Sequence, residues 1–303
     1  MLLRVIHETA YDYVPPVKTA QHMAHLKPRH DERQQVLSHQ LTVRPAPALQ
    51  TETTDVYGNT RAFFSLSGAH DGLTVTADSV VATRDSDEPA ASLPWEVVRE
   101  RMRYHRKAAW DPATEFVFAS PYVPRHENFV AYARPSFPAG RQLWESAHEL
   151  MQRIHQDFAY ETEATDVSTP ALEALELRKG VCQDFAHIML GCLRSLGLPA
   201  RYVSGYLLTH PAPGRPRLVG RDASHAWVSV YLPGESPEAG TWADLDPTND
   251  RMPGEDYVRL ATGRDYSDVS PIRGVIHGGA NHTLRVAVTV SPMEAAETAQ
   301  ARP

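Results

Sequence analysis

The chain has 303 residues, of which 42% are hydrophobic and 22% are charged, so it is long enough for one large or two medium-sized globular domains. Its formal net charge of -7 argues against a nucleic-acid-binding protein, because such proteins need a basic surface. The sequence contains no run of about 18 apolar residues that could cross a membrane, and its first residues lack the apolar segment of a signal peptide. We therefore expect a cytoplasmic protein that binds neither nucleic acid nor membranes.

The first quarter of the chain predicts β-strands at residues 2–13, 40–44 and 73–83. Pro15 and Pro16 are expected to end the first of these strands. Between the second and third, Gly58-Asn59 separates two extended runs, which indicates a hairpin. These elements predict an antiparallel β domain over residues 1–84.

Residues 85–140 contain many prolines and predict a linker followed by an irregular segment without long regular elements. Aromatic residues recur in this segment, at Trp110, Phe116, Phe118, Tyr122, Phe129 and Tyr132. We expect them to pack against the core of the following domain, and a role in lining a substrate groove is the alternative.

Two helices are predicted next, at residues 141–158 and 171–177, and a third begins just after Gly180. In the third helix, apolar residues recur at the spacing of a half-buried helix until Gly197 and Pro199 end it. Cys182 falls in its first turn, where free backbone N–H groups and the helix dipole favour an anion. A thiol at that position loses its proton more easily and becomes a better nucleophile.

The second cysteine, Cys192, lies on the apolar stripe of the same helix and is expected to be an ordinary buried residue. Ten helical residues separate the two sulfur-bearing positions by about 15 Å, which is too far for a disulfide. Two unbridged thiols suggest a reducing compartment.

The remaining chain predicts strands at 200–208, 224–232 and 241–246. His225 opens the second of these strands, and Asp246 lies at the end of the third, where Pro247 stops it. If the two strands are antiparallel neighbours, His225 and Asp246 lie at the same edge of the sheet. Asp244 shares a strand face with Asp246 and remains an alternative partner for the histidine.

Three motifs, Gly180-Val-Cys-Gln-Asp-Phe-Ala, Ser224-His-Ala-Trp-Val and Trp242-Ala-Asp-Leu-Asp-Pro-Thr-Asn, resemble the core motifs of the transglutaminase-like superfamily, a papain-like group of thiol enzymes. The resemblance implies a catalytic triad of Cys182, His225 and Asp246, because the family's acid follows the tryptophan by four positions. His7-Glu-Thr, Leu26-Lys-Pro-Arg and Asp55-Val-Tyr-Gly-Asn are similar to the N-terminal domain of bacterial relatives.

Together these observations predict an α+β protein with an N-terminal antiparallel β domain (1–84), a linker segment (85–140), a papain-like, transglutaminase-like catalytic core (141–292) and a disordered tail (293–303). Gly274, Gly278 and Gly279 indicate a flexible turn, and residues 282–290 a last strand of the core. His187 lies some 140° around the helix from Cys182, so the two make a poor chelate, and we expect no metal and no cofactor.

The predicted function is acyl transfer on an amide bond of a peptide or protein. Cys182 is the nucleophile, His225 the base and Asp246 its orienting acid, with the backbone N–H of Cys182 as oxyanion donor. Tyr160 is a further candidate donor. Hydrolysis of the thioester is preferred, because water is the default acceptor. Transamidation by an amine and a catalytically silent peptide-binding module are the alternatives.

Overall fold

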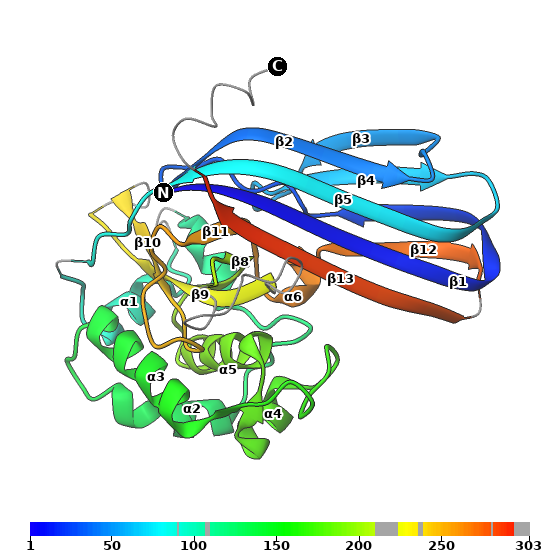
Figure 1. The fold of residues 1–303 in the computed structure, drawn as a ribbon. Coiled ribbons are helices and arrows are strands. Elements are labelled where there is room, and N and C mark those ends of the chain that lie inside the picture. Colours follow the sequence, from blue (N-terminus) through cyan, green and yellow to red (C-terminus); the bar gives the residue numbers. More distant parts are fainter. Residues whose placement is uncertain (90, 107–109, 210–223, 236–238, 280, 294–303) are drawn as a thin grey trace, which may run out of the picture.

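The computed structural model describes residues 1–303 except 90, 107–109, 210–223, 236–238, 280 and 294–303, so the predicted tail lies almost wholly outside the described residues. The described chain forms a seven-stranded antiparallel sheet, a four-stranded antiparallel sheet and a short parallel strand pair. The four-stranded sheet lies between the helices and the larger sheet (Figure 1). The predicted α+β class, a β domain followed by a helix packed on an antiparallel sheet, is confirmed.

The larger sheet is built around one long strand, β1. Its strands are β1 (Leu2–Ala24), β2 (Gln34–Arg44), β3 (Leu49–Thr54), β4 (Thr60–Leu66), β5 (His70–Thr83), β12 (Ile272–Gly278) and β13 (Asn281–Pro292). The order is β2-β5-β1-β4-β3, and β12 and β13 also pair with β1. The prediction that Pro15 and Pro16 end the first strand is wrong. The chain instead shifts register against β5 between Asp12 and Val17 and continues.

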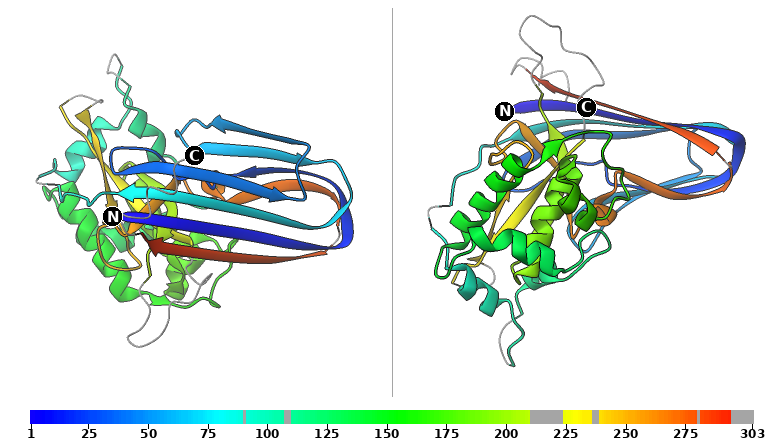
Figure 2. Two further views of the ribbon diagram at one scale, coloured as in Figure 1. Left: turned by 45° about the horizontal axis from the view of Figure 1, so that its top comes forward. Right: turned by 90° about the horizontal axis from the view of Figure 1, so that it is seen from below.

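The two last strands, which fall within the predicted core range of 141–292, pair with β1 in this larger sheet. Val288 and Val290 are buried beside Val5, and β13 pairs with β1 from Leu3 to Val14. Gly274 and Gly278, predicted to mark a flexible turn, lie within β12. Period-two alternation identifies a strand but carries no information about which of two sheets it joins. The last described strand thus lies in the same sheet as the first (Figure 2).

The core that carries the predicted site consists of the smaller sheet and the helices below it. Its elements are α3 (Leu143–Asp157), β6 (Ala159–Tyr160), α4 (Ala171–Leu177), β7 (Lys179–Gly180), α5 (Cys182–Ser195), β8 (Ala200–Leu207), β9 (Ser224–Leu232), β10 (Thr241–Leu245), β11 (Tyr257–Gly263) and α6 (Tyr266–Val269). The sheet order is β10-β9-β8-β11. Residues 210–216, whose prolines predict a loop between β8 and β9, lie outside the described residues.

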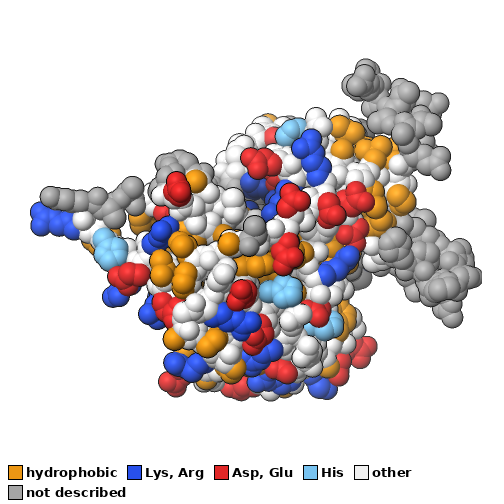
Figure 3. All heavy atoms as spheres, turned by 90° about the vertical axis from the view of Figure 1, so that its left-hand side faces the viewer, with side chains coloured by type: hydrophobic (Ala, Val, Ile, Leu, Met, Phe, Trp, Pro, Cys, Tyr) orange, Lys and Arg blue, Asp and Glu red, His pale blue; other side chains and the backbone are white. Residues whose placement is uncertain are grey.

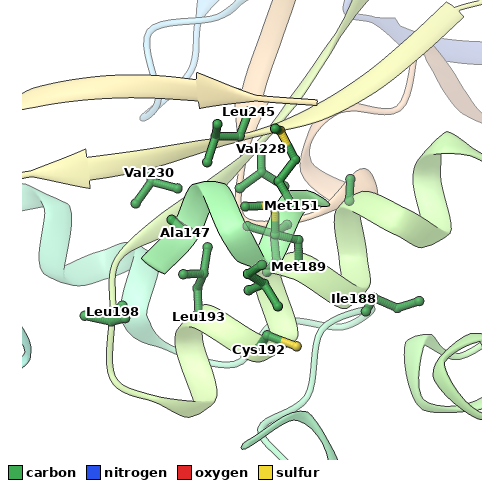
Figure 4. Close-up of a cluster of buried hydrophobic side chains, with 14 of the residues drawn as sticks. Ala147, Met151, Ile188, Met189, Cys192, Leu193, Leu198, Val228, Val230 and Leu245 are labelled. Atoms are coloured by element: carbon green, nitrogen blue, oxygen red, sulfur yellow. The ribbon is translucent and has the colours of Figure 1, made fainter. Parts of the chain in front are cut away.

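Helix α5 is held by an apolar cluster that it shares with α3, β9 and β10 (Figure 4). Met151 of α3, Met189 of α5 and Val228 of β9 are fully buried in this cluster. Burial of each such side chain contributes about 1.5–3 kcal/mol relative to leaving it in water, so the cluster fixes the helix firmly on the sheet. Cys192 lies in the same cluster with 0% exposure, and burial raises the pKa of its thiol far above the ordinary value.

Described residues of the proline-rich segment 85–140 pack into this core from Leu93 onward. It contains α1 (Trp95–Arg101), α2 (Glu127–Ala133) and the two short 3-10 helices η1 (Pro112–Val117) and η2 (Arg134–Ser136). Phe129 is fully buried, and its ring lies so close to Gly191 of α5 that a Cβ there would come within 2.8 Å of it. Trp110 and Phe118, by contrast, remain largely exposed. Buried aromatic packing therefore compensates for the short elements that the prolines impose.

The N-terminal domain and the core are joined at β11, the edge strand of the smaller sheet. The amide side chain of Gln34 donates to the Arg259 carbonyl and accepts from the Arg259 N–H, each at 2.7 Å. Asn59 makes the same pair of bonds with the backbone of Thr262, at 2.7 and 2.8 Å. These two amides satisfy backbone groups that an open sheet edge would leave exposed.

On the face of the molecule shown in Figure 3, acidic and basic side chains are interspersed and form no large region of one sign. Among the described residues, no helix combines the length and the apolar character needed to span a membrane.

Candidate active site

Cys182 is the first residue of α5 and is partly exposed to solvent. The turn that precedes it is clamped by Asp184, whose carboxylate accepts the Val181 N–H at 2.8 Å and the Thr165 hydroxyl at 2.6 Å. A Cβ at Gly180 would lie 2.5 Å from that carboxylate, so only glycine fits beside the clamp. The local sequence around the thiol therefore fixes where the helix starts.

His225 and Asp246 are brought together by the pairing of β9 with its two neighbours. His225 lies opposite Gly205 of β8, and β10 runs antiparallel to β9 and ends at Leu245, opposite Val228. Asp246 follows directly, and the His225 ring donates from Nε2 to its Oδ2 at 2.6 Å. The predicted meeting of these two residues at one sheet edge is therefore present in the structure.

The Cys182 thiol lies close enough to the His225 ring to act on the imidazole together with Asp246. Burial acts to lower the pKa of His225, but hydrogen bonds and charge interactions with Asp246 and Cys182 outweigh it and raise the pKa to about 10. Because Asp246 occupies Nε2, the nitrogen left for the sulfur is Nδ1. A protonated imidazole in this place stabilises a thiolate.

Asp246 is fully buried, and every hydrogen bond it makes holds its carboxylate ionised. Oδ2 also accepts the Asn249 amide and the Tyr257 hydroxyl, each at 2.7 Å, and Oδ1 accepts the Thr248 N–H at 2.9 Å. Burial acts to raise the pKa of Asp246, but the bonds and charge of His225, with help from Asn249 and Tyr257, lower it below the ordinary value. Sequence reasoning did not identify Asn249 or Tyr257 as parts of the site.

The alternative acid, Asp244, has a different set of contacts. It is buried on a face of β10 where its Oδ2 accepts Arg259 at 2.7 Å and the indole of Trp227 at 3.1 Å. Among the described residues, it makes no hydrogen bond to His225 that would compete with Asp246. The structure therefore favours Asp246 as the partner of the histidine.

Two further residues considered from the sequence lie near the helix start. Tyr160 is 53% exposed on β6, and the pKa of its phenol is raised by burial and by the charge of Cys182, which places it within electrostatic reach of the sulfur. His187 is buried against Tyr122 and Tyr202, and burial lowers its pKa to about 3. Across the described ranges, no group of three or more His, Cys, Asp or Glu side chains is arranged to hold a metal ion.

Comparisons with known proteins agree with the motifs. Residues 3–82 match the bacterial transglutaminase-like N-terminal region, and residues 131–247 match the transglutaminase-like superfamily. The uncharacterized protein Rv2569c of Mycobacterium tuberculosis is 40% identical over 300 residues, which cover 96% of this chain and 93% of the relative. The chain belongs to the transglutaminase-like superfamily. Membership supports a cysteine-based enzyme.

Other members of this superfamily and a solved structure extend the comparison. Protein ML0607 of Mycobacterium leprae is 32% identical over 292 residues, covering 95% of this chain and 98% of that protein. A crystal structure from Cytophaga hutchinsonii, described as a candidate cysteine protease, superposes with a TM-score of 0.73 at 20% identity and covers 97% of this chain and 91% of its own. At that identity the superposition shows a shared fold only.

Proposed function

We propose that this transglutaminase-like protein is a cysteine-dependent acyl-transfer enzyme that acts on amide bonds of peptides or proteins. The observation that carries the proposal is the position of His225, which is hydrogen-bonded to Asp246 at 2.6 Å and lies close enough to Cys182 for the thiol to help raise the pKa of the imidazole. A nucleophile, a base and a group that orients the base are the set that this chemistry needs.

In the proposed reaction, the Cys182 thiolate attacks the amide carbonyl and forms a tetrahedral oxyanion. The backbone N–H of Cys182, in the first turn of α5, is the donor that we assign to this oxyanion. His225 then gives its proton to the amide nitrogen as the C–N bond breaks, which leaves a thioester and a free amine. Asp246 keeps the imidazole in the productive tautomer and stabilises its cation throughout.

The second half of the reaction restores the enzyme. A water molecule gives a proton to His225 and attacks the thioester, so that a carboxylic acid leaves and the sulfur is released. We favour water as the acceptor because it needs no dedicated binding site. Transfer to an amine is the alternative, supported by a 32% identical segment of 151 residues in the protein-glutamine gamma-glutamyltransferase of Pseudomonas aeruginosa, which spans 47% of this chain but only 21% of that protein.

We also propose a cytoplasmic location. Both cysteines are free, and a reducing compartment keeps thiols in that state.

The test is the rate of alkylation by iodoacetamide at neutral pH, with Cys192 as an internal control within the same helix. Cys182 should react rapidly and Cys192, which is buried, should not react in the folded protein. If the two react equally slowly, or if Cys182 reacts only at the pH of an ordinary thiol, the protein is a silent binding module.

A second assay separates the two acceptors. The protein is incubated with a glutamine-rich protein and a labelled amine, and Cys182→Ala serves as the control. Ammonia without incorporated label identifies hydrolysis, whereas label on the protein identifies transamidation. Activity that survives Cys182→Ala would overturn the proposed nucleophile.

A further inference from the structure

A hollow lies beside β9 and β10, at the end of these strands that is farther from His225 and Asp246. Its volume is about 490 Å³, and its walls come from η1, the β3–β4 turn and the smaller sheet. Tyr231 and Trp242 face each other across β9 and β10 there, six residues along β9 from His225. At about 3.3 Å per residue the two sites are roughly 20 Å apart. The hollow is therefore separate from the catalytic cysteine.

The distinctive side chain of this hollow is Arg201, which has no hydrogen-bond or ion-pair partner among the residues that the structure describes. Its Nε is inaccessible to solvent, and its guanidinium carbon stacks 4.2 Å from the ring centre of Trp242. A donor that is left unpaired away from water is costly, and the Nε–H of Arg201 is such a donor. A ligand that presents an acceptor in the hollow would satisfy it.

The neighbouring carboxylates are bound mainly by Arg259, and Arg201 makes no ion pair with either of them among the described residues, although Asp244 Oδ1 is itself buried without a hydrogen-bond partner. Arg259 pairs with Asp244 at 2.7 Å and with Asp31 at 3.2 Å. Arg29 and Arg33 lie 3.8 and 3.9 Å from the same two acids. Together with Arg201, four arginines therefore surround Asp31 and Asp244. Burial lowers the pKa of Arg201 to about 9, against the attraction of Asp244, and an anion beside the guanidinium would favour its charged form.

The rest of the wall determines what kind of anion fits. Phe116 lies edge-on to Trp242 at 5.3 Å, and Tyr57 and Tyr231 extend the aromatic surface. Flat apolar groups pack well on such walls. Two acids also line the hollow. Asp111 accepts the Tyr231 hydroxyl at 2.8 Å, and Glu115 lies on η1. Their charges oppose a ligand that carries more than one negative charge.

We propose that this hollow binds a small aromatic monocarboxylate. Its carboxylate pairs with the guanidinium of Arg201, and its ring packs against Phe116 and Trp242. The site does not depend on the proposed acyl-transfer activity, because none of its residues contacts Cys182, His225 or Asp246 in the contacts described above.

Calorimetric titration of the full chain with phenylacetate tests the proposal. Phenylacetamide, which lacks the charge, and phenyl phosphate, which carries more negative charge, serve as matched ligands. We expect phenylacetate to bind at least about tenfold more tightly than either, because a hydrogen-bonded charge pair contributes that much or more. Equal binding of the amide, or no binding of phenylacetate, would overturn the assignment.

Variants then locate the binding. Arg201→Met should weaken phenylacetate binding at least about tenfold, whereas Arg99→Met, which removes another arginine stacked on a tryptophan, at 5.0 Å from Trp95, should leave it unchanged. If Arg201→Met does not fold, Glu115→Gln on η1 serves as the second variant. It removes a negative charge from the wall of the hollow, so it should tighten phenyl phosphate binding more than phenylacetate binding. The site would be refuted if Arg201→Met and Arg99→Met had equal effects on phenylacetate binding. It would also be refuted if Glu115→Gln left the ratio of the phenyl phosphate and phenylacetate affinities unchanged.

Discussion

Asp244 and Asp246 lie two residues apart at the end of β10, and replacing each of them by asparagine should have a different effect on the protein. Asp246→Asn removes the charge that holds the His225 ring at 2.6 Å. A hydrogen bond to a charged group contributes about 1.5–3 kcal/mol, so the alkylation rate of Cys182 at neutral pH should fall by about 10- to 150-fold. The histidine loses the anion that favours its protonated form, and the thiolate loses its counter-charge.

Asp244→Asn should instead destabilise the protein and leave the thiol reactive. It breaks the buried ion pair with Arg259, whose two nitrogens lie 2.7 and 3.1 Å from the carboxylate. Loss of one partner of such a pair costs about 3–5 kcal/mol, and the lower value applies because Arg259 keeps Asp31 at 3.2 Å. For a chain of this size we expect the melting temperature to fall by about 6–12 °C.

The assay compares the alkylation rate, measured well below either melting temperature, with the melting temperature from circular dichroism. Asp246→Asn should slow alkylation far more than Asp244→Asn does. If Asp244→Asn slows alkylation as much as Asp246→Asn while the fold is intact, the assignment of the orienting acid to Asp246 is refuted.

Three further predictions concern the helix start and titration. Gly180→Ala places a Cβ 2.5 Å from the Asp184 carboxylate, so it should cost about 1–3 kcal/mol of stability and slow the alkylation of Cys182. Gly68→Ala is the control, because its Cβ would meet nothing within 4 Å, and it should change neither stability nor alkylation. The pKa of His225, about 10 in the folded protein, lies above its unfolded value. Its stabilising contribution is therefore complete below about pH 6.5 and is lost as pH rises through 10. NMR titration should show a lower pKa of His225 in Asp246→Asn, because the anion that favours the protonated ring is gone. Burial lowers the pKa of His7 to about 4, so protonation of this ring in the unfolded chain should make stability decrease by up to about 1.4 kcal/mol per pH unit as pH falls from about 6.5 to 4. Burial also lowers the pKa of His22, His39 and His187, so His7→Gln should reduce the slope measured by urea unfolding at several pH values by up to that amount without abolishing it. An unchanged slope in His7→Gln would contradict the reasoning.

The candidate site could be found from the sequence because each of its three residues carries a local signal. Cys182 follows a glycine at a helix start, His225 opens a strand, and Asp246 precedes the proline that ends one. Asn249 lies three residues beyond Asp246 and could have been included, because a side chain in that turn folds back onto the carboxylate. Tyr257 could not, because its hydroxyl reaches Asp246 only through the place of β11 in the smaller sheet.

Long-range pairing also explains where the predicted domain boundaries differ from the structure. The sequence of β13 alternates as any half-buried strand does, and only its pairing with β1 assigns it to the N-terminal sheet. The same holds for the proline-rich segment, where Phe129 has no helical or strand periodicity to reveal that it packs on Gly191. Periodicity predicts elements, whereas membership of a sheet or a core depends on partners far away in the chain.

The strand β11 gives the N-terminal domain a part in positioning the candidate site. One edge of β11 receives the side-chain amides of Gln34 and Asn59 from the N-terminal domain. From the same strand, Tyr257 donates to Asp246 and Arg259 binds Asp244. A shift of β11 would move the hydrogen-bond partners of Asp246 and Asp244 together. It would also leave the backbone groups of β11 that Gln34 and Asn59 satisfy without hydrogen-bond partners. The N-terminal domain therefore constrains the carboxylate that orients His225, although none of the residues hydrogen-bonded to that carboxylate comes from the domain.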